Sequence, residues 1–378
     1  MDFTLSEEHK KLQTMVRDLA TNKLAPVADE LDRRQEFAMD NLKMMAELGL
    51  TGLTIPPKYG GSGGDELSIA IAMEEIARAC ASTCDILDVQ LCLCAAPIYR
   101  WGTEEQRQRF VPPLARGKKV GAFAVTESEA GSDINSIQMT AVRDGDYYIL
   151  NGTKIFITNG DVCDTLVVFA TIPELGKRGM TAFIVEMGTP GYSKGKKYDK
   201  LGMRAATNAD QVLKNCRVPA ANRLGEEGQG MRICLDILDH GRIGIGAQAV
   251  GITQAVLDRA IDYAKQRIQF GAPIGQNQAI SWMLADIATQ IEAARLLIYE
   301  AAYVANTAAP FTKQAAMAKV YASELCMKAT TQGIQIFGGY GYMMDSPMQR
   351  YFRDAKLTTI YEGTSEVQRI VISRALLR

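Results

Sequence analysis

The sequence predicts an α+β protein in which a β region lies between two helical regions. Apolar residues recur at spacings of three and four up to about residue 117 and again from about residue 225, which is the period of amphipathic helices. Between these regions, short runs rich in β-branched and aromatic residues predict strands. Because 378 residues are too many for one ordinary core, we expect three domains. Their expected bounds are 1–117 (N-terminal α-helical), 118–222 (middle antiparallel β) and 223–378 (C-terminal α-helical).

The first region predicts several helices and one loop. SEEHKKLQTMVRDLATNKLAPVADELDRR has helical spacing, and we expect Ser6 to be its N-cap. NLKMMAELGL and DELSIAIAMEEIARACAS predict further helices. The stretch TIPPKYGGSGGD between them is rich in proline and glycine, so it predicts a loop.

The middle region contains the runs VGAFAVTE, YYILNGTKIFIT, TLVVFATI, TAFIVEM and QVLKNCRV. Asn-Gly is the strongest short signal for a two-residue hairpin, so we expect a tight turn at Asn151-Gly152. In the last region, Ile280 to Asn306 contains neither glycine nor proline and predicts one long helix. Leu235 to Gly251 is expected to be the start of a helix, and FGGYGY (Phe337 to Tyr342) to be a glycine-rich break.

Composition excludes several classes of protein. A formal net charge of −1 gives no reason to expect a nucleic-acid partner, and we expect no membrane insertion because no run of about 18 apolar residues occurs. The N-terminus is acidic and amphipathic, unlike a signal peptide, so a cytoplasmic location is expected, or the mitochondrial matrix in a eukaryote. The eight cysteines form no CxxC pair and should be reduced and buried. With only two histidines and no such pair, no metal site is predicted.

One candidate binding loop follows the first predicted strand. FAVTESEAGSD (Phe123 to Asp133) ends in small residues, and its backbone N–H groups and the Thr126 and Ser132 hydroxyls are able to hold a polar heterocycle or a phosphate. It lacks the GxGxxG pattern and no βαβ unit surrounds it, so a Rossmann site is rejected. The alternative is an ordinary solvent-exposed loop.

Three further segments have binding potential, each weak on its own. Arg242, near Asp239, is suited to phosphate binding or purine stacking, or alternatively belongs to a surface salt-bridge cluster. The stretch KQRIQFGAPIGQNQ supplies Arg267, Phe270 and Gln278. QIFGGYGY supplies Gln335, Ile336, Gly338 and Gly339, and its glycines permit close approach of a ligand to the backbone.

The segment IYEGTSEVQR places Glu362 between an aromatic residue and a glycine. Two interpretations are open: a solvated turn carboxylate, or a catalytic base. The shortage of histidine favours carboxylates, lysines or a cofactor for any acid–base chemistry.

Together, VTESEAGSD, RIGIGAQAVG, QRIQFGAPIGQNQ, QIFGGYGY and IYEGTSEVQR resemble the acyl-CoA dehydrogenase family, in order and in spacing, over essentially the whole chain. The resemblance implies a C-terminal four-helix bundle, with FAD between the β domain and the bundle, completed by a neighbouring subunit of a homotetramer. It also implies an acyl-CoA substrate, of a short-chain or alicyclic type, and electron-transferring flavoprotein as the electron acceptor.

Family positions map onto this sequence residue by residue. The implied cofactor-binding residues are Phe123, Val125, Thr126, Gly131, Ser132, Phe156, Ile157, Thr158, Arg267, Phe270, Gln278, Gln335, Ile336, Gly338, Gly339, Thr364 and Glu366. The implied substrate-binding residues are Ser132, Asp239, Arg242, Tyr361 and Gly363.

In this family the acid of the YEG stretch removes the α-proton, the β-hydrogen leaves as hydride to flavin N5, and the product is a trans-2-enoyl-CoA. Some branches, such as isovaleryl-CoA dehydrogenase, carry the base just before the arginine equivalent to Arg242. That position here is Gly241, which has no side chain, so the resemblance points to Glu362 as the catalytic base.

The chain departs from its family at three places. Phe156 replaces a more usual tryptophan, and Ser128 replaces a common proline. In ASTCDILDVQLCLCAAP, Asp85 and Asp88 share one helical face where the family is mostly apolar or neutral. One interpretation is that Ser82 or Thr83 caps this helix and both acids lie in its first turns, favoured by the helix dipole. The other is that one aspartate reaches the acyl group as a second base on an alicyclic substrate of the cyclohexanecarboxyl type.

Two alternatives to a dehydrogenase remain. An acyl-CoA oxidase or a flavin monooxygenase would use the same fold differently, although such oxidases are usually longer and such monooxygenases commonly lose the acid. A non-catalytic helical scaffold, from a different class, would have no reason to keep Glu362 together with every flavin segment.

Overall fold

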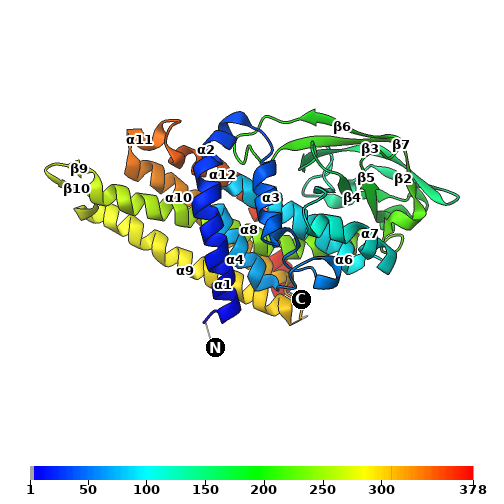
Figure 1. Ribbon diagram of the computed structural model, residues 1–378, viewed down its shortest axis with the longest axis horizontal. Helices are drawn as coiled ribbons and strands as arrows, with labels where there is room; N and C mark the ends of the chain where they lie inside the picture. The colour runs from blue at the N-terminus through cyan, green and yellow to red at the C-terminus, as the bar shows by residue number, and fades with distance from the viewer. Residues whose placement is uncertain (1–3, 308, 378) are drawn as a thin grey trace.

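The structure, a computed structural model, describes residues 4–307 and 309–377. It confirms the α+β fold with a β region between two helical regions (Figure 1). The helices before the sheet are α1 (Glu7–Leu19), α2 (Ala25–Arg34), α3 (Met39–Glu47), α4 (Glu66–Ala79), α5 (Ala81–Asp88), α6 (Ala96–Trp101) and α7 (Glu104–Ala115). The Ser6 hydroxyl accepts a hydrogen bond from the His9 backbone N–H at 3.2 Å, which confirms the predicted N-cap.

Eight strands form one sheet in the order β6-β7-β3-β2-β4-β5-β8, with β1 paired to β4. They are β1 (Gly121–Ala124), β2 (Thr140–Asp144), β3 (Tyr147–Thr158), β4 (Thr165–Thr171), β5 (Met180–Glu186), β6 (Tyr192–Lys197), β7 (Asn208–Pro219) and β8 (Arg223–Leu224). Most neighbours are antiparallel, as expected, but β4 pairs in parallel with β1 and, at one position, with β2. Apolar side chains of this sheet make a separate core that includes Tyr148 and Phe183.

The predicted hairpin at Asn151-Gly152 is wrong. β3 runs through both residues, and its pairing with β7 shifts register between Leu150 and Gly152, which is a β-bulge. A Cβ atom at Gly152 would lie 2.8 Å from Met139, so glycine is needed here for close packing rather than for a turn. The chain reverses instead at Gly145, with φ of +57°, between β2 and β3.

The C-terminal helices are α8 (Gly230–Gln266), α9 (Gln278–Asn306), α10 (Thr312–Phe337), α11 (Gly339–Tyr342), α12 (Pro347–Thr358) and α13 (Ser365–Leu376). The expected long helix is α9. The helix expected to start near Leu235 already begins at Gly230, so Asp239 and Arg242 lie inside α8. The long helices α8, α9 and α10 pack against one another, and α13 packs along α10.

Helix α8 organises the molecule because it contacts α4, α5, α9 and α10. Its 37 residues extend over roughly 55 Å at 1.5 Å per residue. In Figure 1 the sheet lies at one end of the molecule. The small hairpin of β9 (Ile268–Gln269) and β10 (Ala272–Pro273), which follows α8, projects at the other end.

The stretch Ala81–Trp101 forms a nearly continuous helix in which Val89–Ala95 is π-helical. Among the described residues it is the one helical stretch long and apolar enough to cross a membrane, and its apolar window of 18 residues is buried inside the protein. All eight cysteines are buried and unpaired, which confirms that prediction.

Capping does not account for Asp85 and Asp88, contrary to one of the two interpretations. The N-cap position of α5 is Cys80. The Ser82 hydroxyl accepts from the Ala205 N–H, and the Thr83 hydroxyl accepts from the Asn41 amide. Both aspartates are 1% exposed. The acids therefore sit inside the core and not on a solvated first turn.

Candidate active site

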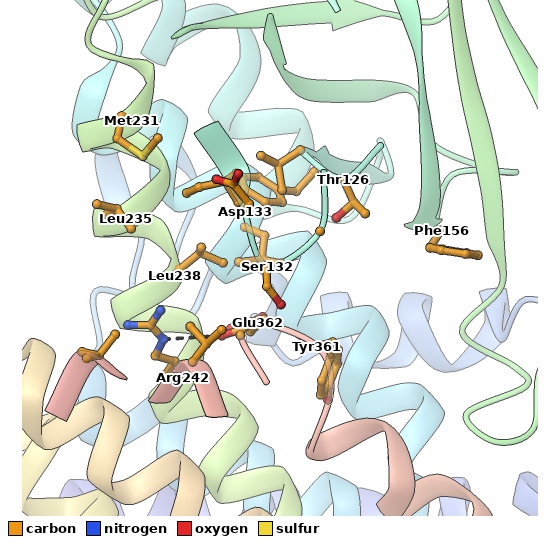
Figure 2. A pocket seen from close by; sticks show the side chains of 18 of the residues that line it. Thr126, Ser132, Asp133, Phe156, Met231, Leu235, Leu238, Arg242, Tyr361 and Glu362 are labelled. Atoms are coloured by element: carbon orange, nitrogen blue, oxygen red, sulfur yellow. Dashed lines mark hydrogen bonds between the residues drawn. The ribbon is translucent and has the colours of Figure 1, made fainter. Parts of the chain in front are cut away.

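A cavity of about 490 Å³ lies between the sheet and the N-terminal half of α8. The loop after β1 contributes Ser132 and Asp133, α8 contributes Met231, Leu235 and Leu238, and the segment before α13 contributes Tyr361 and Glu362 (Figure 2). Arg242 and Glu362 lie at one end of this space, and the Ser132 side chain points towards that end in Figure 2.

Glu362 has an unusual backbone conformation. Its φ is +51°, and that of Gly363 is +94°, so two consecutive residues are left-handed. This conformation costs a residue other than glycine on the order of 1–3 kcal/mol, and such residues persist only where the surroundings hold them. The Gln368 amide donates to the carbonyls of Glu362 (3.1 Å) and Gly363 (2.9 Å), and the Lys319 ammonium donates to the Gly363 carbonyl (2.7 Å).

Two glycines of α8 make room for carboxyl groups. A Cβ atom at Gly241 would lie 2.2 Å from Glu362 Oε2, and one at Gly244 would lie 2.6 Å from Asp88 Oδ1. Because residues three apart share a helix face, the two carboxyl groups lie side by side against α8. The missing side chains are therefore what allows these acids to occupy the site.

Burial raises the pKa of Glu362 to about 7, against the opposing effects of Asp88, Arg242 and Lys319. Among the described residues, no donor reaches Glu362 Oε2 or either oxygen of Asp88. Two facing carboxyl groups without donors cannot both ionise at low cost. Burial and the neighbouring Glu362 carboxyl raise the pKa of Asp88 well above its usual range, which favours the neutral form of Asp88 beside Glu362.

Asp85 lines the cavity itself. Burial raises its pKa from 3.8 to about 6, partly opposed by the buried Lys200 ammonium. Lys200 is held by the Ala206 carbonyl and the Asn208 side chain, so it approaches Asp85 without forming an ion pair with it. The acid at the cavity wall is therefore an isolated buried carboxyl group.

Arg242 is 3% exposed and connects the base to α8. Its Nε donates to the Glu362 carbonyl at 3.4 Å and its Nη1 donates to Asp239 Oδ1 at 2.6 Å. Asp239 also accepts from the Thr312 hydroxyl at the start of α10. Of the two predicted substrate-binding residues on α8, Arg242 lines the cavity and Asp239 orients Arg242 from behind it.

The predicted cofactor residues fall into two groups. The first lines this cavity and comprises Phe123, Val125, Thr126, Gly131, Ser132, Phe156, Ile157 and Thr158. A Cβ atom at Gly131 would meet no other atom within 4 Å, so the loop leaves open space there. Phe156 has φ of +60° and is 56% exposed, with its ring against Tyr198. Its ring is therefore available to cover a planar group.

The second group lies at the other end of α8. Arg267, Phe270, Ile336, Gly338 and Gly339 line a cavity of about 630 Å³ beside the β9–β10 hairpin. Leu238 and Tyr263, one at each cavity, are 25 residues apart, which is roughly 37 Å along the helix. The chain therefore does not bring the two groups together. Gln278 and Gln335 are exposed near the second cavity, Thr364 caps α13, and Glu366 is exposed in the first turn of α13.

Family models match three segments: residues 6–118 match the N-terminal domain of acyl-CoA dehydrogenase, 122–216 the middle domain and 228–377 the C-terminal domain. The chain belongs to the acyl-CoA dehydrogenase family. This confirms the predicted oxidoreductase class and its FAD cofactor. The matches follow the order of the predicted regions.

Curated and structural relatives of this acyl-CoA dehydrogenase cover its whole length. A short-chain specific acyl-CoA dehydrogenase of Clostridium acetobutylicum is 47% identical over 100% of both chains. The structure of butyryl-CoA dehydrogenase from Megasphaera elsdenii is 46% identical, with a TM-score of 0.98 and 100% coverage of both chains. A chain from a study of the electron transferring flavoprotein of Acidaminococcus fermentans is 47% identical, with the same TM-score and coverage.

The residues of the first cavity fit a flavin. Open space above Gly131, the exposed ring of Phe156 and the hydroxyls of Thr126 and Ser132 offer a surface with both apolar and hydrogen-bonding character. A flavin needs both, because its ring is planar and its edge carries polar atoms.

Two residues that contact the backbone beside Glu362 were not predicted from the sequence. Lys319 and Gln368 are 0% exposed and hold the carbonyls beside Glu362. Lys319 was detectable, since it interrupts the alanine-rich apolar side of a helix in AAMAKVYAS, where a charge is costly. Gln368 lies in the helix that follows the YEG stretch, and its neighbours in the sequence give no sign that its side chain is buried.

Stability should depend on pH through Asp85. The pKa of Asp85 is about 6 in the folded protein, against 3.8 for an ordinary aspartate in the unfolded chain. Because the folded protein holds this proton more tightly, the resulting contribution to the free energy of unfolding is fully present below pH 3.8 and is lost as the pH rises through 6. Asp85→Asn removes this loss, and one pKa unit corresponds to about 1.4 kcal/mol. We therefore expect the melting temperature of Asp85→Asn minus that of wild type to be more positive at pH 8 than at pH 5.

The control is Asp146→Asn, in the exposed turn before β3. Its melting temperature should follow that of wild type at both pH values. If the melting temperature of Asp85→Asn depends on pH in the same way as that of wild type, Asp85 is not a buried carboxyl group with a raised pKa.

Proposed function

We propose that this chain is an FAD-dependent dehydrogenase that converts a short-chain acyl-CoA to the trans-2-enoyl-CoA, with Glu362 as the base. One observation carries the proposal: the Glu362 carboxyl group lies at one end of the cavity, with its Oε2 atom buried and without a hydrogen-bond partner among the described residues, and burial raises its pKa to about 7. A carbon acid beside a thioester is very weak, so its base must be desolvated and well placed. The geometry of Glu362 satisfies both needs.

The proton step uses residues of this chain only. Ionised Glu362 takes the α-proton and becomes a neutral acid, which its apolar surroundings tolerate better than the charge. Protonated Asp88 would stay beside it, so the site would not hold two adjacent carboxylates. Arg242 and Lys319 remain nearby as fixed positive charges that favour the ionised base before the reaction.

When bound, FAD would supply the hydride acceptor for the β-hydrogen. Phe123, Val125, Thr126, Gly131, Ser132 and the segment Phe156–Thr158 are the residues that would hold its ring side. The thioester would lie against Ser132, Arg242, Tyr361 and Gly363. The Tyr361 hydroxyl donates to the Gln248 side chain, which fixes the ring beside the base.

The two separate groups of cofactor residues support an assembly. Since the cavity beside the hairpin lies roughly 37 Å along α8 from the first one, it would complete the cofactor site of a second copy in a homotetramer. Arg267, Phe270, Gln278, Gln335, Ile336, Gly338 and Gly339 would serve that neighbour, with Thr364 and Glu366 at the start of α13 on the flavin side. The relative found with an electron transferring flavoprotein supports such a protein as the electron acceptor. The site of action would be the cytoplasm in a bacterium or the mitochondrial matrix in a eukaryote.

The substrate has a second possible form. Asp85 on the cavity wall and Asp88 beside Glu362 place two additional carboxyl groups where an acyl chain would end. An alicyclic acyl group would present a further carbon to such an acid, which would act there as a second base. Asp85 has direct access to the cavity, whereas Asp88 lies behind the base, so Asp85 is the better placed of the two.

Glu362→Gln tests the base. The substitution keeps the shape of the side chain but removes its proton affinity, so kcat with butyryl-CoA should fall by roughly 10²- to 10⁴-fold. The measurement is bleaching of the yellow protein by butyryl-CoA under anaerobic conditions. The FAD content of Glu362→Gln and its binding of butyryl-CoA should match those of wild type. The control is Glu300→Gln, which changes an exposed acid on α9 and should match wild type in kcat, FAD content and binding.

The same experiment separates the other functions. A colourless protein that takes up no FAD would support a non-catalytic scaffold. Bleaching followed by rapid reoxidation in air would support an oxidase, and unchanged bleaching in Glu362→Gln would contradict the assigned base.

Asp85→Asn and Asp88→Asn test the alicyclic substrate. Turnover of butyryl-CoA is compared with that of cyclohexanecarboxyl-CoA and a cyclohexenecarboxyl-CoA in both variants and in wild type. If one aspartate is a second base, its loss should lower turnover of the cyclic substrates by at least tenfold while butyryl-CoA turnover falls less. A change in preference below about threefold in both variants, or about 0.65 kcal/mol, rules the second base out.

A further inference from the structure

The Lys319 ammonium group is buried without an ion pair. Lys319 lies in the N-terminal third of α10, is 0% exposed, and donates to the Gly363 carbonyl at 2.7 Å. Among the described residues, no carboxylate lies within ion-pairing distance of its Nζ. A buried charge is costly unless it is compensated, so packing alone gives no reason for a lysine here. Glu362, the largest favourable charge acting on Lys319, supplies that compensation from beyond contact distance.

The left-handed turn at Glu362 and Gly363 is held from three helices. Lys319 reaches it from α10, Gln368 from α13 and Arg242 from α8, and all three donate to one or both of its carbonyls. The two carbonyls point towards these donors, while the Glu362 side chain points into the space left by Gly241. Holding the carbonyls therefore fixes the direction of the carboxyl group.

We propose that Lys319 is a positioning residue for Glu362, which holds the Gly363 carbonyl and supplies a buried positive charge beside the base. This rests on the proposed role of Glu362 as the base. Lys319 acts in two ways that can be separated. Its hydrogen bond maintains the turn together with Gln368, and its charge favours ionisation of the carboxyl group.

The charged and titratable groups around this pair come from several elements. Burial lowers the pKa of Lys319 to about 8, so it remains mostly charged at neutral pH. The groups facing Glu362 or Lys319 are Asp85 and Asp88 on α5, Cys92 on the π-helical stretch, Arg242 on α8, Glu324 on α10, Tyr361, and Glu366 on α13. Removing the Lys319 charge should raise the pH at which Glu362 loses its proton.

The experiment uses the FAD-loaded protein and three variants. Lys319→Met removes both charge and donor, Lys319→Gln removes only the charge, and Gln368→Leu removes only a donor. The control is Ser323→Ala, a buried residue one turn further along α10 that bonds only within its own helix. Readouts are kcat and KM for butyryl-CoA across pH, FAD content and melting temperature.

A further readout needs no turnover. 3-Thiabutanoyl-CoA has an acidic α-carbon but no β-hydrogen, so it can lose a proton in the site without passing on a hydride. The long-wavelength absorbance of its anion against oxidised flavin, followed against pH, reports the proton affinity of the base.

We expect kcat in Lys319→Met to fall at least tenfold with KM changed less than threefold, and the onset of 3-thiabutanoyl-CoA deprotonation to move to higher pH. Lys319→Gln should recover part of kcat but keep the shifted onset. Gln368→Leu should lower kcat with the onset unmoved. Ser323→Ala should match wild type in every readout.

Two outcomes would overturn the proposal. In one, Lys319→Met lowers only the melting temperature and leaves kcat and the deprotonation onset as in wild type, which is a purely structural role. In the other, Lys319→Met does not fold and Gln368→Leu keeps full kcat. If Glu362→Gln, measured in parallel, still turns over butyryl-CoA, the proposed function itself fails. An inactive Glu362→Gln beside a normal Lys319→Met removes only the inference about Lys319.

Discussion

The central constraint on this protein is the desolvation of a carboxylate. In its proposed role Glu362 must be basic enough to remove a proton from carbon, and burial favours this by raising its pKa to about 7. Burial alone would leave the group protonated, so the site also needs positive charge. Arg242 and Lys319 supply it from two different helices, and neither forms an ion pair with the base. Burial and these two positive charges thus act on the pKa of Glu362 in opposite directions, and burial has the larger effect.

Much of the surrounding structure serves this arrangement. α8 lacks side chains at Gly241 and Gly244, where the Glu362 and Asp88 carboxyl groups lie. The backbone at Glu362 is left-handed, and donors from three helices hold it so. Asp88, kept neutral, fills the space beside the base without adding a second charge. These features explain why a long helix, a buried lysine and an acidic core segment meet at one place.

The sequence was sufficient for the order of the three regions, because helical and strand periods differ clearly along the chain. Its co-linear motifs also predicted Glu362 and the loop from Phe123 to Asp133 as site residues, and the structure brings both to one cavity. The hairpin predicted from the sequence at Asn151-Gly152 is wrong, because the glycine is needed there for close packing against Met139 and does not form a turn. The sequence also left open a surface position for Asp85 and Asp88. Local sequence signals for caps and hairpins carry no information about which surfaces become covered by other elements. The structure at Gly152 and at the two aspartates depends on such tertiary packing, so the sequence alone did not predict it.

The glycine at position 241 has a consequence for how such enzymes diverge. In the family this position is an alternative location for the base, and here a single added carbon would lie 2.2 Å from Glu362 Oε2. The two locations therefore compete for one volume, and a chain that carried an acid at both would have to distort one of them. Relocating the base during evolution thus requires emptying position 362 before or together with filling position 241.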